Sequence, residues 1–535
     1  MAKKKVQKNS EPKKFYFFKK HKTALLLALI ILIQTVVFIL VGTEKQYFHM
    51  DEAYSFGLSS YDKVEIHDNE DFYNTWHDGA YYADYLEVND NERFNLTPVY
   101  ENQKNDVHPP FYYFLLRIFM EFSPNRITKW GGIILNIIIY ALITVFTFFI
   151  TKRLWAGKHH ADAIALAVAF TSSVTLAALT SVVYIRMYAL STLNIAIITY
   201  LHLRLIENYD RKTLIFISLS ALIGSLTHYF FLFYLFILFI MTLIRRIKNK
   251  EKIAGYIIAI AVAAVLSLLI FPYSIQHILF SNRGTGAVSG IFSPDSLSQI
   301  SEFLDLAQTY TFNGMLIPIT ITFVLLLIIS CRHLSKIKIN RAFWYVFCPT
   351  IFYFLLTAVA SPYIELRYIM PICGMFFVVM IYLLDAALEI RIPATITKII
   401  TAIVLVITLI TPFITKTEPM QILYRDKKTI VTRVEDELNL PTVYWFNKDE
   451  DRFLDDIYLF TKLDNSYISR DNELTAESIK TILEGKDLSK GLIVFINANQ
   501  DNEKILETFM KATSFGLSIH EEHMNACDIY LLKGD

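Results

Sequence analysis

The stretch from Thr23 to Gly42 decides the fold, and it reads TALLLALIILIQTVVFILVG. It holds no charged residue, and about 20 apolar residues are what a helix needs to cross roughly 30 Å of hydrocarbon. The stretch is too long for the apolar core of a signal peptide, and no small-residue cleavage site follows it. The sequence therefore predicts a retained membrane anchor.

Similar stretches recur along the chain, and the composition agrees with them. Of 535 residues, 54% are hydrophobic, 14% aromatic and 19% charged, against roughly a quarter charged in a typical soluble domain. The predicted spans are 23–42, 131–150, 161–181, 185–204, 213–227, 228–244, 253–272, 314–331, 342–360, 368–387 and 396–414. The predicted fold class is a mostly α, polytopic membrane protein of about 11 transmembrane helices with a small extracytoplasmic α/β domain at its C-terminus.

Charge is distributed unevenly between the connecting segments. Residues 1–22 hold nine lysines and one acidic residue, whereas 43–130 hold 7 basic and 16 acidic residues and 415–535 hold 15 and 23. Because basic connectors stay in the cytoplasm, this pattern predicts a cytoplasmic N-terminus, an extracytoplasmic C-terminus and a location in the cell membrane. The near balance of 51 basic and 50 acidic residues gives no reason to expect nucleic acid, and membrane lipids are the expected surroundings.

The chain divides into a basic cytoplasmic tail at 1–22, a multi-span domain at 23–414 and an extracytoplasmic domain at 415–535. In the last part three stretches are typical of buried strands and one of a helix, namely Thr442–Phe446, Leu492–Asn497, Ile529–Leu532 and Glu503–Ala512. The first outer loop, 43–130, contains an apolar stretch at 108–122. If 108–122 crossed the membrane, every later basic connector would lie outside, so we predict an interfacial or re-entrant helix with Arg117 and Glu121 as a charged stripe.

Polar side chains gather where the spans meet the outer face. They are Asp51–Glu52 after the first span, the run from His108 to Tyr113 (HPPFYY), the run from Tyr184 to Tyr188 (YIRMY) at an outer turn, His228 between two short helices, and Arg367–Tyr368 before a late span. Ionisable residues at bilayer depth are costly and mark function by default, although a single arginine at a rim is often a snorkelling anchor. Several on one face predict one site.

The chemistry of this set suits transfer from a lipid-phosphate donor. Such a reaction needs a carboxylate to deprotonate an acceptor hydroxyl and cations to neutralise the leaving phosphate. We predict Asp51 as the general base with Glu52 as its catalytic neighbour. Arg186 and Arg367 suit the phosphate because a guanidinium offers a two-pronged fork, and His108 and His228 can donate to the same group. Tyr113, Tyr188 and Tyr368 are predicted to line the substrate groove.

In their order along the chain and in the predicted side of the membrane on which they lie, these motifs resemble those of the integral-membrane C-type glycosyltransferases. Within that group they are most similar to the bacterial relatives of the protein O-mannosyltransferases and the lipid A aminoarabinose transferases. The resemblance covers roughly residues 23–415. It implies a polyprenyl-phosphate-linked sugar as donor, inversion at the anomeric carbon, an extracytoplasmic glycan, lipid or protein as acceptor, Asp51 as base, and Arg186 and Arg367 at the donor phosphate. Some relatives use a divalent metal. The acidic run Asp449–Asp451 and the pair His520 and His523 could hold one, but both are more typical of a solvated surface.

Two other functions are compatible with a polytopic chain. A lipid-linked glycan polymerase or ligase would use closely related chemistry. A transporter or flippase would place charges at mid-span and carry inverted repeats, and neither feature is visible in the sequence.

The predicted topology is tested with reporter fusions at residues 125, 155, 248, 336 and 430. They should report outside, inside, inside, inside and outside, because the basic connectors stay in the cytoplasm. A fusion at 125 that reports the cytoplasm would contradict the re-entrant assignment of 108–122.

Overall fold

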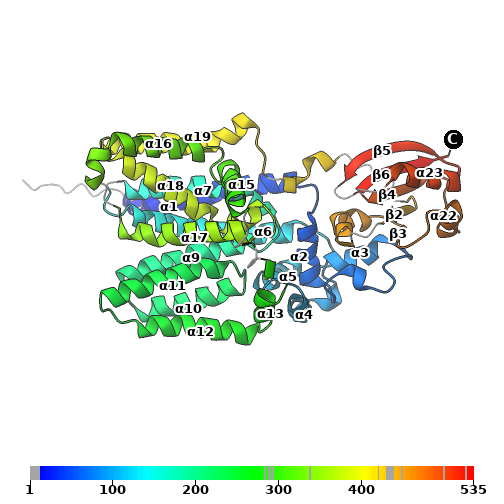
Figure 1. Cartoon of the computed structure of the whole chain (residues 1–535), viewed down its shortest axis with the longest axis horizontal. Coiled ribbons are helices and arrows are strands. Elements are labelled where there is room, and N and C mark those ends of the chain that lie inside the picture. The colour runs from blue at the N-terminus through cyan, green and yellow to red at the C-terminus, as the bar shows by residue number, and fades with distance from the viewer. Residues whose placement is uncertain are drawn as a thin grey trace, which may run out of the picture.

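The computed structural model describes residues 13–158, 160–281, 285–286, 290, 295–336, 339–419, 421–428, 439–446, 450–497, 501–524 and 527–534. A bundle of helices forms one end of the molecule, a small sheet forms the other, and short helices lie between them (Figure 1). The predicted fold class, a polytopic helical protein with a small C-terminal α/β part, is confirmed.

Helices occupy all eleven predicted spans. Their bounds are α1 Lys13–Glu44, α6 Trp130–Leu154, α7 Ala161–Ser173, α8 Leu176–Val183, α9 Tyr188–Glu207, α10 Arg211–Ser225, α11 Phe231–Lys248, α12 Ala254–Ile270, α16 Leu316–Ile329, α17 Arg341–Ala360, α18 Met370–Leu388 and α19 Ala394–Thr415. In the described part of the chain, six helices are long and apolar enough to cross a membrane, namely α1, α6, α9, α17, α18 and α19. Two bent pairs, α7 with α8 and 296–311 with α16, raise this number to eight at most. The predicted eleven spans therefore match the helices in position, but α10, α11 and α12 do not meet this test of length and composition.

Burial separates the central helices from the peripheral ones. The apolar windows of α9 and α18 are 78% buried, whereas those of α1 and α19 are 11% and 22% buried. An apolar helix with this much exposed surface belongs against hydrocarbon, whereas a helix that is apolar and buried belongs in the core. The centre of the bundle is thus built on α9 and α18. The N-terminal end of α9 lies at Tyr188, and that of α18 lies just after Tyr368.

The first outer loop contains four short helices that cover the outer end of the bundle. They are α2 Met50–Ser60, α3 Gly79–Leu86, α4 Thr97–Asn105 and α5 Phe111–Met120, with single turns η1 Ile66–Asp68 and η2 Asp90–Glu92. With 10 residues, α5 is too short to cross a membrane, as predicted. The expected charged stripe is wrong in its placement, because Arg117 is fully buried. It donates to Glu121 Oε1 at 2.9 Å and to the Ser60 carbonyl at 3.2 Å, and so joins α5 to the end of α2.

The segment 273–313, which lies between two predicted spans, contains further helices. They are α13 Ser274–Leu279, α15 Ser296–Leu306 and the π-helical turn η3 Ala307–Thr311. The turn at 226–230 between α10 and α11 agrees with the predicted position of His228 between two short helices.

One six-stranded sheet joins the two outer regions. Its strands are β1 Trp76–His77, β2 Thr442–Trp445, β3 Ser466–Ser469, β4 Leu492–Asn497, β5 Gly516–Met524 and β6 Cys527–Lys533, in the order β1-β3-β2-β4-β6-β5. β2 runs parallel to β3 and β4, and the other pairs are antiparallel. Helices α22 Ala476–Ile482 and α23 Asn502–Thr513 supply Ile479 and Phe509 to a core with Val443 and Val494. The three predicted strands and the predicted helix are confirmed.

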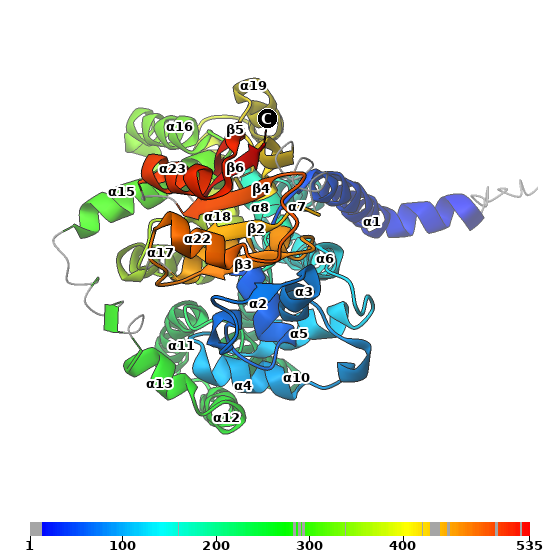
Figure 2. The same ribbon diagram turned by 90° about the vertical axis from the view of Figure 1, so that its right-hand side faces the viewer.

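The edge strand β1 comes from the first outer loop. Trp76 pairs with Tyr467 and His77 with Ser466 of β3, so a segment near residue 76 completes a sheet built mainly from residues after 440. Viewed from the sheet end, α2, α3 and α5 lie beside the sheet over the end of the bundle (Figure 2). The two outer regions form one packed layer.

The contact between α3 and the C-terminal region predicts the effect of a substitution at Gly79. A Cβ at this position would lie 2.3 Å from the Thr461 carbonyl oxygen, so Gly79→Ala should lower the free energy of unfolding by about 1–3 kcal/mol. Gly516→Ala is the matched control, since nothing lies within 4 Å of its added Cβ. Thermal unfolding followed by tryptophan fluorescence measures both, and equal midpoints would contradict the packing of α3 against residue 461.

Candidate active site

A cavity of about 260 Å³ lies where the first outer loop meets the outer ends of the central helices. Seven of the nine predicted site residues line it: Asp51, His108, Arg186, Tyr188, His228, Arg367 and Tyr368. The remaining two, Glu52 and Tyr113, are fully buried. The Tyr113 hydroxyl accepts a hydrogen bond from Arg186, and Glu52 accepts the N–H of Ile185, the residue before Arg186. Segments more than 300 residues apart in the sequence thus meet at one place.

Asp51 lies in the first turn of α2, and a capping box fixes that turn. His49 precedes the helix in an extended conformation, its Nδ1 accepts the Asp51 N–H at 3.1 Å, and Glu52 Oε2 accepts the His49 N–H at 2.8 Å. An accepting Nδ1 requires a neutral imidazole. Burial lowers the pKa of His49 in agreement with this, although the Asp455 and Glu52 carboxylates oppose the shift. The 3.8 Å approach of His49 to Asp51 is therefore not an ion pair.

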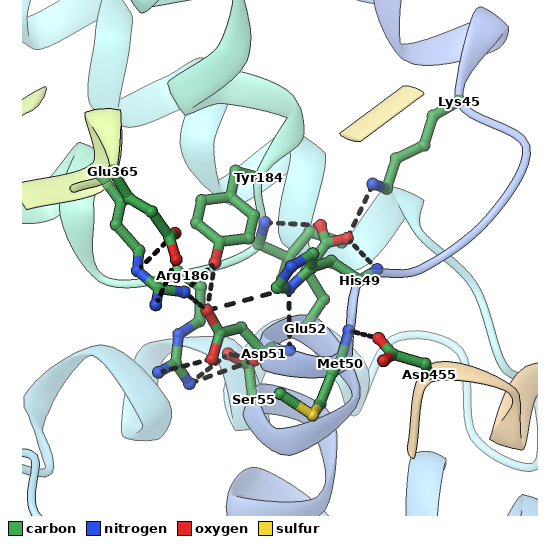
Figure 3. Close-up of polar contacts among 12 residues, drawn as sticks. Lys45, His49, Met50, Asp51, Glu52, Ser55, Tyr184, Arg186, Glu365 and Asp455 are labelled. Atoms are coloured by element: carbon green, nitrogen blue, oxygen red, sulfur yellow. Dashed lines mark hydrogen bonds and ion pairs between the residues drawn. The ribbon is translucent and has the colours of Figure 1, made fainter. Parts of the chain in front are cut away.

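The Asp51 carboxylate lies between two guanidinium groups (Figure 3). Its Oδ2 accepts hydrogen bonds from Arg367 Nη1 and from the Tyr184 hydroxyl, while Arg186 Nη2 lies 3.7 Å from Oδ1. The side chains of Asp51, Arg186 and Arg367 are largely buried. In such surroundings a carboxylate is stable as an anion only because cations and hydrogen-bond donors surround it.

Arg186 is held by a cage of oxygen atoms from several elements. Its Nη1 donates to the Asp51 carbonyl at 3.1 Å, the Tyr113 hydroxyl at 3.3 Å and Ser55 Oγ at 3.4 Å. Tyr113 lies in α5 and Asp51 and Ser55 lie in α2, whereas Arg186 comes from the turn between α8 and α9. Groups from two elements therefore hold the Arg186 guanidinium at the wall of the cavity.

Arg367 connects Asp51 to a second carboxylate. Its Nη2 donates to Glu365 Oε1 at 3.1 Å, and its Nε lies 3.0 Å from Oε2 of the same carboxylate, at ion-pair distance. Burial raises the pKa of Glu365. Arg367 and Glu365 belong to the short segment before α18, so the start of this central helix is tied to α2.

Glu52 faces away from the cavity and joins three segments. Its Oε2 receives Lys45 Nζ at 2.7 Å and its Oε1 receives the Ile185 N–H at 2.9 Å, and both charged side chains are fully buried. Burial lowers the pKa of Lys45, while the Glu52 carboxylate opposes that shift. These contacts give Glu52 a positioning role for α2 and for the turn before Arg186. Its predicted catalytic role stays a prediction.

His108 is oriented by an acidic residue that the sequence analysis did not single out. Asp106 Oδ2 lies 2.7 Å from His108 Nδ1 and also accepts the His108 backbone N–H at 3.1 Å. Burial alone would raise the pKa of Asp106, but His108 and Arg186 lower it below its ordinary value, so the carboxylate is anionic at neutral pH. Because Nδ1 faces this carboxylate, Asp106 sets the orientation of the His108 ring.

The far side of the cavity is lined by His228 and aromatic rings. His228 Nδ1 accepts the Phe230 N–H at 3.2 Å, which leaves the proton on Nε2. The ring of Tyr188 lies 5.6 Å from that of His228, and it stacks at 6.0 Å on Tyr184, which itself donates to Asp51.

Three residues of this site, Asp106, Tyr184 and Glu365, were missed as site residues from the sequence. A signal was present, since Asp106 and Glu365 each stand two residues before a predicted cation, and Tyr184 opens the motif that contains Arg186. Among the described residues, no group of three or more His, Cys, Asp and Glu side chains is arranged to hold a metal ion. We therefore derive no step through a metal.

Comparisons with known proteins identify the fold. No family model matches the chain, and no curated protein matches it in sequence. Two crystal structures of ArnT from Cupriavidus metallidurans do match, each over 94% of this chain and 97% of theirs. The one bound to undecaprenyl phosphate has a TM-score of 0.53 at 9% identity, and the apo one has 0.51 at 8%. The chain has the ArnT fold. The resemblance to this branch of membrane glycosyltransferases is thus confirmed in the architecture.

The ion pair between Asp51 and Arg367 predicts that substitutions at these two residues have coupled effects on stability. Asp51→Asn and Arg367→Gln should each lower the unfolding midpoint, because each removes one partner of a mostly buried pair. The double variant should lose less than the sum, with a coupling energy of about 1 kcal/mol or more from thermal unfolding. The control pair is Arg470 and Asp471, whose side chains are 41% and 91% exposed and whose coupling should stay within about 0.5 kcal/mol. Additive losses at Asp51 and Arg367 would contradict the ion pair.

Proposed function

We propose that the protein is a membrane glycosyltransferase that transfers a sugar from a polyprenyl-phosphate donor to an extracytoplasmic glycan, lipid or protein of the cell envelope, with inversion. The observation that carries this proposal is the convergence of Asp51, Arg186 and Arg367 at one cavity. A base beside two phosphate-binding forks is the combination that such a transfer needs. The ArnT fold supports it, since one ArnT structure is bound to undecaprenyl phosphate.

A second cavity supports a donor with a long hydrocarbon chain. It has a volume of about 390 Å³, lies between α10, α11 and α12, and is lined mainly by apolar residues such as Phe236, Phe239 and Ala263. Tyr229, Leu232 and Ile278 line both cavities. A prenyl chain in the second cavity would place its phosphate beside the cations of the first.

The proposed reaction forms one bond and breaks another at the anomeric carbon. The acceptor hydroxyl attacks this carbon from the face opposite the phosphate, the bond from the anomeric carbon to the phosphate oxygen breaks, and the hydroxyl proton passes to Asp51. The products are the glycosylated acceptor and polyprenyl phosphate. Arg186 and Arg367 neutralise the charge that develops on the leaving phosphate, and the Nε2–H group of His228 donates to one of its oxygens. His108 is proposed as a further phosphate-binding residue, since it lines the same cavity.

The pairing seen without substrate has a consequence for this reaction. A carboxylate shared by two guanidinium groups is a weak base, because both cations favour its anionic form. A donor phosphate competes with Asp51 for the same guanidinium groups, and as they turn to the phosphate the basicity of Asp51 rises. The base therefore becomes effective when the donor is in place. Tyr113 and Glu52 serve as positioning residues behind this centre.

The proposal is tested in a strain that lacks the gene. The strain should lose one envelope glycoconjugate and accumulate its polyprenyl-phosphate-linked sugar, which identifies both acceptor and donor by mass spectrometry. Unchanged glycans and unchanged lipid-linked sugars would contradict a transferase. Accumulation of a lipid-linked glycan with altered chain length would favour the polymerase alternative.

Asp51→Asn tests the base. The neutral amide keeps the shape but accepts no proton, so turnover should fall by about 10²–10⁴-fold while the amount of protein in the membrane stays the same. Asp90→Asn, in the same outer loop with a side chain 65% exposed, is the control and should restore the glycoconjugate fully. Turnover by Asp51→Asn above a tenth of the wild-type rate would reject Asp51 as the general base.

A further inference from the structure

The segment that leads into α2 is covered by the C-terminal region. Lys45 Nζ donates to the Ile422 carbonyl at 2.8 Å, and the Gln46 N–H donates to the Leu423 carbonyl at 2.9 Å. These bonds join residues almost 380 positions apart in the sequence. They hold the backbone at the point where the chain leaves α1 and turns toward Asp51.

Aromatic rings of the C-terminal region close over the next two residues. The ring of Tyr47 packs edge-to-face on Tyr458 at 5.5 Å and on Tyr424 at 5.9 Å, and Phe48 packs on Tyr458 at 5.1 Å. Tyr47 and Phe48 are 2% and 6% exposed. Since fully packed rings leave little freedom for the backbone that carries them, the approach of residues 45–48 to α2 is fixed by residues beyond 420.

One carboxylate of the C-terminal region reaches α2 itself. Asp455, at the end of the turn η8 Glu450–Asp455, accepts the Met50 N–H at 3.2 Å through Oδ1 (Figure 3). Met50 is the first residue of α2, and its N–H belongs to the first turn, where the helix itself supplies no acceptor. A carboxylate is the favoured partner there, because the N-terminal end of a helix carries partial positive charge. The bond lies one residue before Asp51.

We infer that the C-terminal α/β region positions the catalytic base, and that Asp455 is a positioning residue for Asp51. Asp51 must meet Arg186, Arg367 and the acceptor hydroxyl at once, and its place follows from the start and direction of α2. A displacement of about 1 Å in a reacting group can cost on the order of 10²-fold in rate. The inference rests on the proposed function, and it gives the outer region a role in the rate of the reaction.

The test uses the full-length protein in membranes of the deletion strain. Lipid extracted from that strain supplies the accumulated donor, and initial rates over a range of extract give kcat and an apparent KM. Asp455→Ala should lower kcat by about tenfold or more and leave the apparent KM for the donor within twofold, because the phosphate-binding arginines keep their places. Asp455→Asn retains an acceptor oxygen for the Met50 N–H and should recover most of the rate. Asp471→Ala, in the same region with a side chain 91% exposed, is the control.

A merely structural role for Asp455 predicts a different result. It would lower the unfolding midpoint and the amount of active enzyme, raise the apparent KM together with the loss of rate, and give no recovery in Asp455→Asn. Should Asp455→Ala fail to insert, Tyr458→Leu removes the one ring that packs on both Tyr47 and Phe48, without changing charge, and should lower kcat in the same way. Wild-type kcat in the variants that fold would overturn the inference.

A combined variant separates this inference from the proposed function. In an Asp51→Asn background the Asp455→Ala change should reduce the residual rate no further, because there is no base left to position. Full turnover by Asp51→Asn alone would reject Asp51 as the general base and, with it, the part of the proposed function on which this inference rests. An inactive Asp51→Asn together with a fully active Asp455→Ala would leave the proposed function intact and overturn only the positioning role.

Discussion

The outer face of the molecule depends on the ionic contact of the Asp51 carboxylate with the guanidinium groups of Arg186 and Arg367. Each of these groups is largely removed from water, and a buried charge without a partner destabilises the fold by several kcal/mol. The three side chains come from α2, from the turn before α9 and from the segment before α18. Their mutual neutralisation therefore requires that three separate parts of the chain meet, and the cavity exists because they do.

A second buried ion pair, farther from the cavity, also requires that separate segments of the chain meet. Lys45 and Glu52 are both fully buried, and Glu52 also receives the Ile185 N–H, the amide next to Arg186. The two acidic residues Asp51 and Glu52, neighbours in the sequence, thus have different surroundings. Asp51 faces the cavity and the guanidinium groups of Arg186 and Arg367, whereas Glu52 bonds to the backbone next to Arg186.

The two outer regions are mechanically connected as well. β1 of the first outer loop completes the C-terminal sheet, and Gly79 packs on the backbone near residue 461. Residues 45–50 then lie between the helical bundle and the C-terminal region. Any movement of the sheet relative to the bundle would therefore act on the start of α2, which carries Asp51.

The sequence by itself determined the features that depend on local composition. Apolar length predicted the positions of the helices, since a helix in hydrocarbon must satisfy its own backbone and present apolar side chains. The alternation of buried strands and a helix after 440 predicted the small α/β part, and the rim motifs predicted seven of the residues that line the cavity. Each of these signals lies within a short stretch of chain.

Only the tertiary structure decided which polar groups face one another. Four features depend on the direction of side chains and on contacts that local sequence does not specify. Arg117 is buried and bonds to Glu121, and Asp51 and Glu52 face different surroundings. Asp106 orients His108, and Asp455 accepts the Met50 N–H. The sequence around a charged residue such as Arg117 on a short helix is the same whether its side chain is exposed to water or paired with a buried carboxylate. The difference arises from long-range packing, which sets the burial and the partners of each charge, and no local pattern encodes it.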